Sequence, residues 1–177
     1  MSRYTLLKTV LLASGILLVS SVFAQTPGSN SPKTAAESPD AAFVQKAGHG
    51  GLAEVELSKL AVGSATSPQV KQFAEKMVQA HTENNQQLAL IAAHENIALP
   101  KELDGEHAQL RDKLAAQHRA DFDRSYVAAM RGDHQKMVDL LQSSQATVST
   151  EELRTFIKQT LPIVQDHLHM ATELKVE

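Results

Sequence analysis

The sequence predicts an all-α protein built as an antiparallel four-helix bundle with one additional short helix. From about residue 40 onward, apolar residues recur at intervals of three and four, which is the period of an amphipathic helix. No stretch shows the sustained alternation of a half-buried strand, and aromatic residues, which favour strands, make up only 4% of the chain. Each long amphipathic helix must bury one apolar stripe, and four helices do this around a common axis.

Start signals place the individual helices. A Ser-Pro pair stands at residues 38–39 and again at 67–68, where the serine caps the helix and the proline occupies the first turn, which needs no backbone donor. Ser149 and Glu152 have the spacing of a capping box and predict the start of the last helix. We expect the long helices to span residues 38–65, 67–96, 121–144 and 149–174, with the short helix at 104–118.

The amino terminus has the three parts of a secretory signal peptide. Arg3 and Lys8 provide the positive start, an apolar stretch follows from Val10 to Val22, and residues 22–24 fit the positions that signal peptidase reads. The alternative, an uncleaved membrane anchor, needs about 20 apolar residues, and this run is shorter. We therefore expect a signal peptide over residues 1–24 cleaved after Ala24, a flexible linker over 25–39 and a periplasmic helical domain over 40–176.

Composition limits the partners of the exported domain. The chain has no cysteine, which excludes disulfides and an N-terminal lipid anchor. Removal of residues 1–24 takes away two cations and no acid, so the formal net charge of −3 becomes −5. A mildly acidic domain without a basic block is a poor candidate for binding nucleic acid. We expect no transmembrane span after signal cleavage, and the sequence leaves open a protein or envelope partner and the oligomeric state.

Each long helix carries one strongly polar residue near the middle of an otherwise apolar stripe. These residues are Glu54, His81, His134 and His167, and Asn84 is the one neighbour of similar kind on these stripes. A buried carboxylate is costly unless it is paired, and a buried imidazole needs partners for both nitrogens. Since the four groups stand at similar depth on helices that pack together, they are able to converge in the core.

Convergence of these groups suggests a metal site, because helical bundles build such sites from inward side chains on facing helices. Three imidazoles and a carboxylate suit a transition metal such as copper, zinc or iron. A hydrogen bond between Glu54 and a histidine explains the same pattern without any metal. The methionines favour copper if their sulfurs join the imidazoles, although methionine is also an ordinary filler of helical cores. Each lies three or four residues from one of these histidines: Met77, Met130, Met137 and Met170.

Two further groups of residues have structural interpretations. Gly48, Gly50 and Gly51 weaken the first helix, and such a cluster is typical of a bend or of close approach by a neighbouring helix. No nucleophile and base stand in a pattern typical of acyl transfer. We expect the remaining histidines to lie on exposed or peripheral faces; they are His49, His94, His107, His118 and His169.

Four stretches of the chain, residues 43–57, 73–82, 122–134 and 160–168, are together similar to a known family of exported proteins. On these residues the chain resembles the family called domain of unknown function 4142 (DUF4142), whose members are often labelled predicted outer membrane proteins with a ferritin-like fold. The resemblance implies a ferritin-like bundle over nearly the whole exported domain.

The sequence departs from ferritin-like di-iron proteins, which carry Glu-x-x-His on two helices. Val78, Arg131 and Val164 stand three residues before the core histidines, so neither ferroxidase chemistry nor iron storage is implied. The label "outer membrane" also fits a helical chain poorly, and we expect at most a peripheral association with that membrane.

Three functions stay open after these observations. The leading hypothesis is a non-enzymatic exported bundle that binds a transition metal at Glu54, His81, His134 and His167. The alternative is a structural or interaction module of the cell envelope or stress response without metal, in which the polar groups only set helix register. A metal-dependent oxidase is the third, and it requires an open coordination position that the sequence does not reveal.

Overall fold

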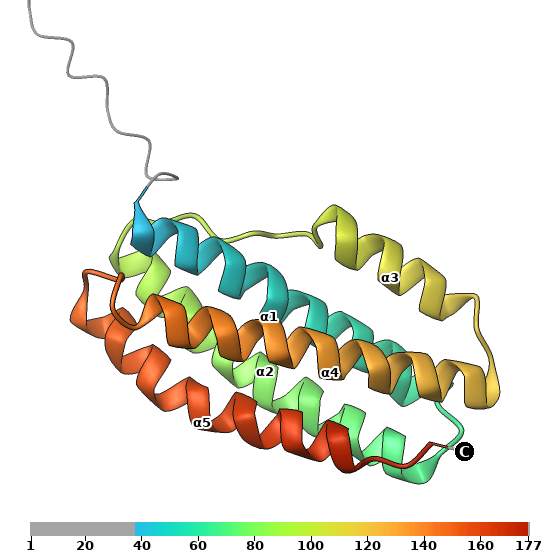
Figure 1. The fold of residues 1–177 in the computed structure, drawn as a ribbon. Coiled ribbons are helices and arrows are strands. Elements are labelled where there is room, and N and C mark those ends of the chain that lie inside the picture. Colours follow the sequence, from blue (N-terminus) through green and yellow to red (C-terminus); the bar gives the residue numbers. More distant parts are fainter. Residues whose placement is uncertain (1–37, 177) are drawn as a thin grey trace, which may run out of the picture. The chain divides into compact units, whose positions relative to one another are not determined.

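The computed structural model describes residues 38–176, and these residues form an all-α bundle, as predicted (Figure 1). The predicted signal peptide at 1–24 and all but the end of the predicted linker at 25–39 lie outside the described residues. The helices are α1 (Pro39–Ser64), α2 (Pro68–His94), α3 (Gly105–Ala115), α4 (Arg119–Ser144) and α5 (Glu151–Glu173).

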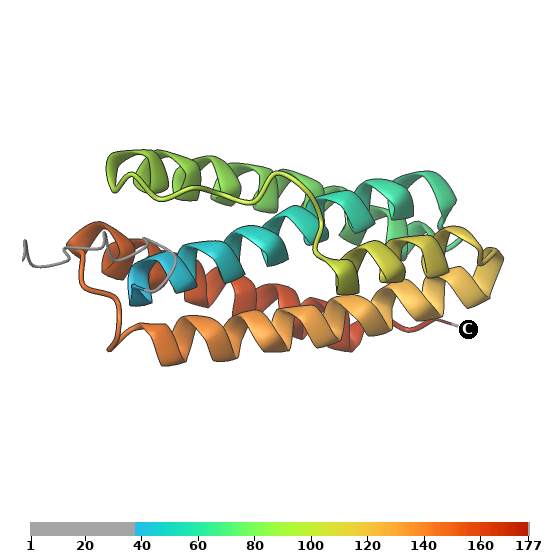
Figure 2. The same cartoon turned by 90° about the horizontal axis from the view of Figure 1, so that it is seen from above.

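The four long helices lie side by side, and each packs on two neighbours that run in the opposite direction (Figures 1 and 2). α1 packs on α2 and α4, while α5 packs on α4 and α2. Since α2 ends at the end of the bundle opposite to the start of α4, the chain returns along the bundle, and α3 lies within this connection (Figure 2). One long crossover between two helix pairs is the connectivity of ferritin-like bundles.

Helix starts follow the predicted signals at α1 and α2. The hydroxyls of Ser38 and Ser67 accept the backbone N–H groups three residues further on, at 3.0 and 3.4 Å. α4 begins at Arg119, two residues earlier than expected. α2 ends at His94 because Asn96 has a φ of 54°, a left-handed conformation that stops a helix.

The predicted capping box at Ser149 and Glu152 is wrong. Thr150 caps α5 instead, and its hydroxyl accepts the backbone N–H three residues on at 3.4 Å. The Asp40 carboxylate at the start of α1 accepts hydrogen bonds from both the backbone N–H and the hydroxyl of Ser149. Ser149 therefore bonds to Asp40, which is distant in the sequence, and does not cap α5.

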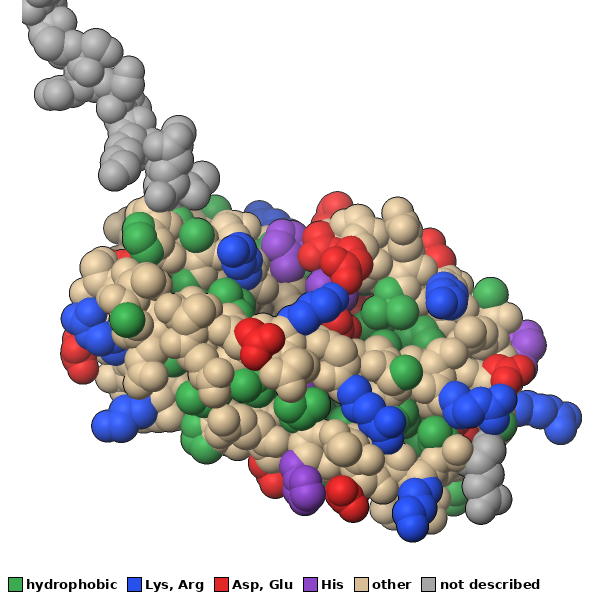
Figure 3. Space-filling model, in the orientation of Figure 1, with side chains coloured by type: hydrophobic (Ala, Val, Ile, Leu, Met, Phe, Trp, Pro, Cys, Tyr) green, Lys and Arg blue, Asp and Glu red, His purple; other side chains and the backbone are tan. Residues whose placement is uncertain are grey.

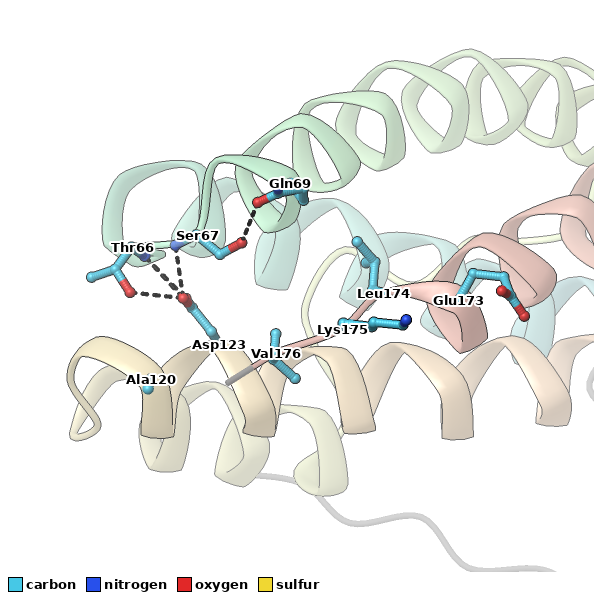
Figure 4. Close-up of a pocket in the computed structure, with 9 residues that line it drawn as sticks. All are labelled: Thr66, Ser67, Gln69, Ala120, Asp123, Glu173, Leu174, Lys175 and Val176. Atoms are coloured by element: carbon cyan, nitrogen blue, oxygen red, sulfur yellow. Dashed lines mark hydrogen bonds between the residues drawn. The ribbon is translucent and has the colours of Figure 1, made fainter.

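Asp123 ties the α1–α2 turn to α4 in a similar way (Figure 4). Its carboxylate accepts hydrogen bonds from the backbone N–H groups of Thr66 and Ser67 and from the Thr66 hydroxyl, the shortest at 2.8 Å. A cavity of about 650 Å³ opens beside these bonds, between the turn, the start of α4 and the residues after α5. Because these hydrogen bonds occupy the buried carboxylate, we assign Asp123 a structural role and propose no chemistry for the cavity.

Close approach at the glycines of α1 is confirmed. A Cβ atom on Gly51 would lie 2.0 Å from Oδ1 of Asn85 on α2, so a larger residue here would force the Asn85 side chain to move. A Cβ atom on Gly48 would lie 2.8 Å from Cδ of Pro100, in the connection between α2 and α3. The glycine cluster therefore lets α1 approach both a helix and a loop.

A polar layer divides the hydrophobic core into two apolar clusters. One cluster surrounds the first half of α1 and the other its second half. Between them lie four polar side chains that are each at most 3% exposed, namely Glu54, His81, His134 and His167. Along the described part of the chain, no helix has both the length and the apolar character needed to cross a membrane.

Candidate metal centre

The structure brings together the four residues that the sequence analysis selected. Glu54 lies on α1, His81 on α2, His134 on α4 and His167 on α5, and each occupies the inward face near the middle of its helix. Helices of similar length that run antiparallel bring their central positions to one level. One polar residue per helix therefore becomes one polar cluster.

Three imidazole nitrogens point to a common centre. His81 Nε2 lies 3.3 Å from His134 Nε2 and 3.3 Å from His167 Nδ1. Each ring offers one nitrogen, and the three nitrogens lie within 4.8 Å of one another, close enough to hold a metal ion together. Two ligand atoms at bond lengths of about 2.0–2.1 Å in a tetrahedral zinc site are about 3.3 Å apart. Two of the three separations therefore match the edge of such a tetrahedron.

Glu54 lies on the other side of the imidazoles. Its oxygens are 2.8 Å from His81 Nδ1 and 3.2 Å from His134 Nδ1, whereas the Nε2 atoms of these rings face the common centre. A carboxylate behind a ligating histidine orients the ring and makes it a stronger electron donor. The position of Glu54 therefore suits a supporting group, and its direct coordination of a metal stays a prediction.

The surroundings determine which nitrogen of each ring carries the proton. His134 Nδ1 lies 2.8 Å from the carbonyl oxygen of Met130, which only accepts hydrogen bonds, so the proton belongs on Nδ1. The Glu54 carboxylate likewise favours the proton on Nδ1 of His81. Both Nε2 atoms then carry lone pairs, and these face each other at 3.3 Å. If all three rings are neutral, only His167 is left to donate a hydrogen bond. Its Nδ1 lies 3.3 Å from His81 Nε2, so the Nε2 atom of His134 is left without a donor among these rings.

The ionisation of these groups also favours a cation in the cluster. Burial opposes ionisation of Glu54, yet the neighbouring imidazoles of His81 and His134 lower its pKa to about 2. Burial, together with the neighbouring histidines and Lys76, lowers the pKa of His167 to about 3, and burial also lowers the pKa of His134. At neutral pH the core thus holds a carboxylate anion that a cation among the imidazoles would balance.

Two of the four methionine sulfurs have other partners. Met130 Sδ lies 3.9 Å from the Ser58 hydroxyl, which is also 2.8 Å from the Tyr126 hydroxyl. Met170 Sδ lies 3.2 Å from Nζ of Lys76 near the surface. These contacts favour the interpretation of the methionines as packing residues.

A second polar cluster was not predicted from the sequence. The expectation that His107 lies on an exposed or peripheral face is wrong, because this residue is only 9% exposed. Its partners are Asp104, at the cap of α3, and Asp133, which directly precedes His134. An acid three residues before a histidine at a helix start is a detectable pattern. The contact with Asp133 depends on where α3 packs, so no local pattern reveals it.

Fold and cluster define the class of the protein, a ferritin-like helical bundle with three buried histidines that converge between its long helices. The chain belongs to the family described as domain of unknown function DUF4142, whose model matches residues 25–174. This match confirms the family resemblance drawn from the sequence.

Solved structures with a similar fold include two proteins of another family. One is a DUF305 fragment from Deinococcus radiodurans, with a TM-score of 0.67 and 13% identity over 76% of this chain and 93% of that chain. Another is a DUF305 protein from Streptomyces coelicolor that is named as a secreted protein, with a TM-score of 0.65 and 14% identity over 77% of this chain and 89% of that chain. At this identity the likeness shows the fold alone. No curated protein matches the chain.

Proposed function

We propose that this protein is an exported, non-enzymatic bundle that binds one transition metal ion through His81, His134 and His167. Glu54 supports the site from behind the first two rings. The observation that carries the proposal is that His81 Nε2 lies 3.3 Å from both His134 Nε2 and His167 Nδ1 in a buried core. A cation among these nitrogens would bind their lone pairs and balance the Glu54 charge.

The ligand set favours zinc or copper. Neutral imidazole nitrogens bind both metals well, and the nitrogen separations fit the short bonds of a tetrahedral ion. A ferritin-type di-iron centre uses several carboxylates. Within residues 38–176, Glu54 is the carboxylate that contacts these rings, and one carboxylate is too few for a centre of two iron ions.

Burial favours binding over catalysis. The three histidines are each at most 3% exposed, so an ion among them is shielded from solvent and from substrates. An oxidase requires an open coordination position that a reactant can reach. The arrangement therefore suits a protein that stores, buffers or carries a metal ion.

Export rests on separate support. The first 24 residues have the composition of a cleavable signal peptide, and the family match begins at residue 25, directly after the predicted cleavage site. One structural neighbour is also named as a secreted protein. We therefore propose a periplasmic location, and a peripheral association with the outer membrane is compatible with the helical fold.

The test is metal content. Protein purified from periplasm is analysed for zinc, copper and iron, then stripped with a chelator and dialysed against each ion separately. We expect the wild-type chain to hold an ion that the His81→Ala/His134→Ala variant loses. His169→Gln, an exposed histidine on α5, is the matched control and should bind like wild type. Equal, substoichiometric metal in all three proteins would refute the proposal.

A structural module without metal is the second candidate. It is supported by the same cluster, because a proton shared among the imidazoles also balances the Glu54 charge and links all four helices. In that case dialysis against zinc or copper leaves the thermal unfolding temperature unchanged. Pull-downs from envelope extracts then identify the partner that the bundle contacts.

A further inference from the structure

The seam between α2 and α5 is the most lightly packed of the four seams that surround the three-histidine centre. Among the four pairs of neighbouring long helices, α2 and α5 make the fewest contacts with each other. On another side of the bundle α3 packs on both α1 and α4, and Figure 3 shows histidine, acidic and basic side chains gathered on the surface where these helices meet. The seam between α2 and α5 thus offers the least packed path from solvent to the core.

A hollow opens on this seam beside two histidines that face each other across it. His81 of α2 and His167 of α5 place ring nitrogens 3.3 Å apart. The hollow has a volume of about 210 Å³ and is lined by the same two helices. Its lining includes Ala80, which directly precedes His81, and Ile163, about one helical turn before His167. The hollow therefore lies within about one turn of the histidine pair.

A hydrogen bond joins the two helices at this hollow. The Thr160 hydroxyl donates to Asn84 Oδ1 at 2.9 Å, and both residues line the hollow. Asn84 stands three residues after His81, so the two share a face of α2. Thr160 stands seven residues before His167, two turns along the same face of α5. Since Thr160 is only 3% exposed, this bond closes the seam at the inner side of the hollow.

Pro162 makes α5 easier to deform beside this hydrogen bond. Proline has no backbone N–H, so Pro162 donates nothing to the carbonyl of Lys158 one turn earlier. Thr160 lies between these two residues. A helix with a gap in its backbone hydrogen bonds bends there more easily than an intact helix. The gap gives α5 a point at which to move away from α2.

The opposite side of the histidine pair suits an entering cation less well. There Lys76 of α2 reaches across the seam, and its ammonium group lies 3.4 Å from Asp166 Oδ2 and 3.2 Å from Met170 Sδ. Met170 follows His167 by three residues, whereas the hollow lies before this histidine. A positive charge repels an approaching metal ion, while the hollow has the exposed Glu83 in its lining. Charge therefore favours entry through the hollow.

We propose that a metal ion reaches the three-histidine centre through the hollow between α2 and α5, and that the hydrogen bond from Thr160 to Asn84 closes this route. The inference rests on the proposed function, since it concerns the same centre. An entering ion passes Glu83 and then the side-chain oxygens of Asn84 and Thr160 before it meets the ring nitrogens. Opening requires this one hydrogen bond to break and α5 to bend at Pro162, while the histidines stay in place.

A residue that closes the route affects rates and leaves affinity unchanged. Loss of the hydrogen bond makes opening easier in both the empty and the filled protein, so the rate constants for uptake and release rise by the same factor. One hydrogen bond corresponds to about 2–10-fold in such rates. Kd is the ratio of the two rate constants and keeps its wild-type value. A residue that only supports the shape of the centre would change Kd instead.

Zinc exchange of the purified protein measures both rates. Stopped-flow mixing of metal-free protein with Zn²⁺ gives uptake, mixing of zinc-loaded protein with excess chromophoric chelator gives release, and equilibrium competition gives Kd. We expect Thr160→Val and Asn84→Leu to raise both rates about 2–10-fold at unchanged Kd. Thr160→Ser keeps the hydroxyl and should exchange like wild type, whereas Ile163→Trp fills the hollow and should slow both rates. Thr172→Val is the matched control, because the exposed Thr172 donates within α5, to the Leu168 carbonyl at 2.8 Å.

Three outcomes would overturn the route. Unchanged rates in Thr160→Val and Asn84→Leu, with zinc bound at wild-type affinity, would remove the route and leave the centre itself intact. Faster exchange in Lys76→Gln alone would show that the ion enters at the other end of the seam. A wild-type chain that binds no zinc would refute the centre and the route together. Far-UV circular dichroism checks that each variant keeps its helix content, and the two halves of the hydrogen bond provide independent variants.

Discussion

The Nε2 atoms of His81 and His134 face each other at 3.3 Å between the two apolar clusters of the core. Each ring has its other nitrogen beside an acceptor, the Glu54 carboxylate for one and a backbone carbonyl for the other. Two acceptors at this distance repel unless a proton or a metal ion lies between them. We therefore expect the stability of the bundle to depend on cations and on pH.

Removal of His81 should destabilise the metal-free protein, because Glu54 then loses its closest partner in the core. Leaving a buried charged group without its partner costs about 3–5 kcal/mol, so His81→Leu should lower the free energy of unfolding by that amount. The double variant Glu54→Leu/His81→Leu removes the stranded carboxylate and should recover most of the loss. Urea unfolding in the presence of a chelator measures both values. A double variant as unstable as the single one would contradict the pairing.

Glu54 should tune metal affinity without setting the number of ions. Loss of a supporting carboxylate typically weakens metal binding about 10–100-fold, so Glu54→Gln should raise the Kd for zinc or copper by that factor and keep the stoichiometry of wild type. Glu56→Gln is the matched control, since Glu56 lies on the same helix and is 43% exposed. Competition with a chelator of known affinity measures the Kd. Loss of the ion with Glu54→Gln would instead make Glu54 a direct ligand.

Acid should destabilise the metal-free bundle well above the range in which carboxylates titrate. The pKa of His167 is lowered from 6.5 to about 3, so between these values the unfolded chain binds a proton that the folded chain does not. The free energy of unfolding is therefore unaffected by this group above pH 6.5 and falls by about 1.4 kcal/mol per pH unit below it. The stability contributed by ionised Glu54 is lost later, between pH 4.5 and about 2.

Chemical unfolding from pH 8 to pH 4 in the presence of a chelator checks this slope. His167→Gln should flatten it, because glutamine does not titrate. A free energy of unfolding that stays constant from pH 7 to pH 5 in the wild-type chain would contradict the buried neutral histidine.

Asp123 should contribute to stability and not to metal binding. Asp123→Ala leaves the backbone N–H groups of Thr66 and Ser67 without their partner, and we expect a loss of about 2–3 kcal/mol. Asp121→Ala is the matched control, because Asp121 is 73% exposed and its pair with Arg124 is worth at most about 1 kcal/mol. Thermal unfolding and zinc stoichiometry are measured on both variants. A changed zinc stoichiometry in Asp123→Ala would show that the turn affects the metal centre.

The helices and the four core polar residues were predictable because they depend on short-range rules. Apolar spacing determines which face of each helix is buried, and Glu54, His81, His134 and His167 interrupt those faces. Ser-Pro starts place α1 and α2 to within a residue. The helical class, the bundle architecture and the residues of the cluster thus follow from sequence alone.

Relationships between helices required the tertiary structure. The helical period gives the direction of a side chain from its own axis, but it does not say which ring nitrogen meets which oxygen. Only the packed bundle places Glu54 beside Nδ1 of His81. It also pairs Ser149 with Asp40, where the local pattern predicts a capping box, and it buries His107 next to Asp133. The sequence alone determined that Glu54, His81, His134 and His167 enter the core. The tertiary structure decided how they pair, because distances between separate helices depend on how all of them pack at once.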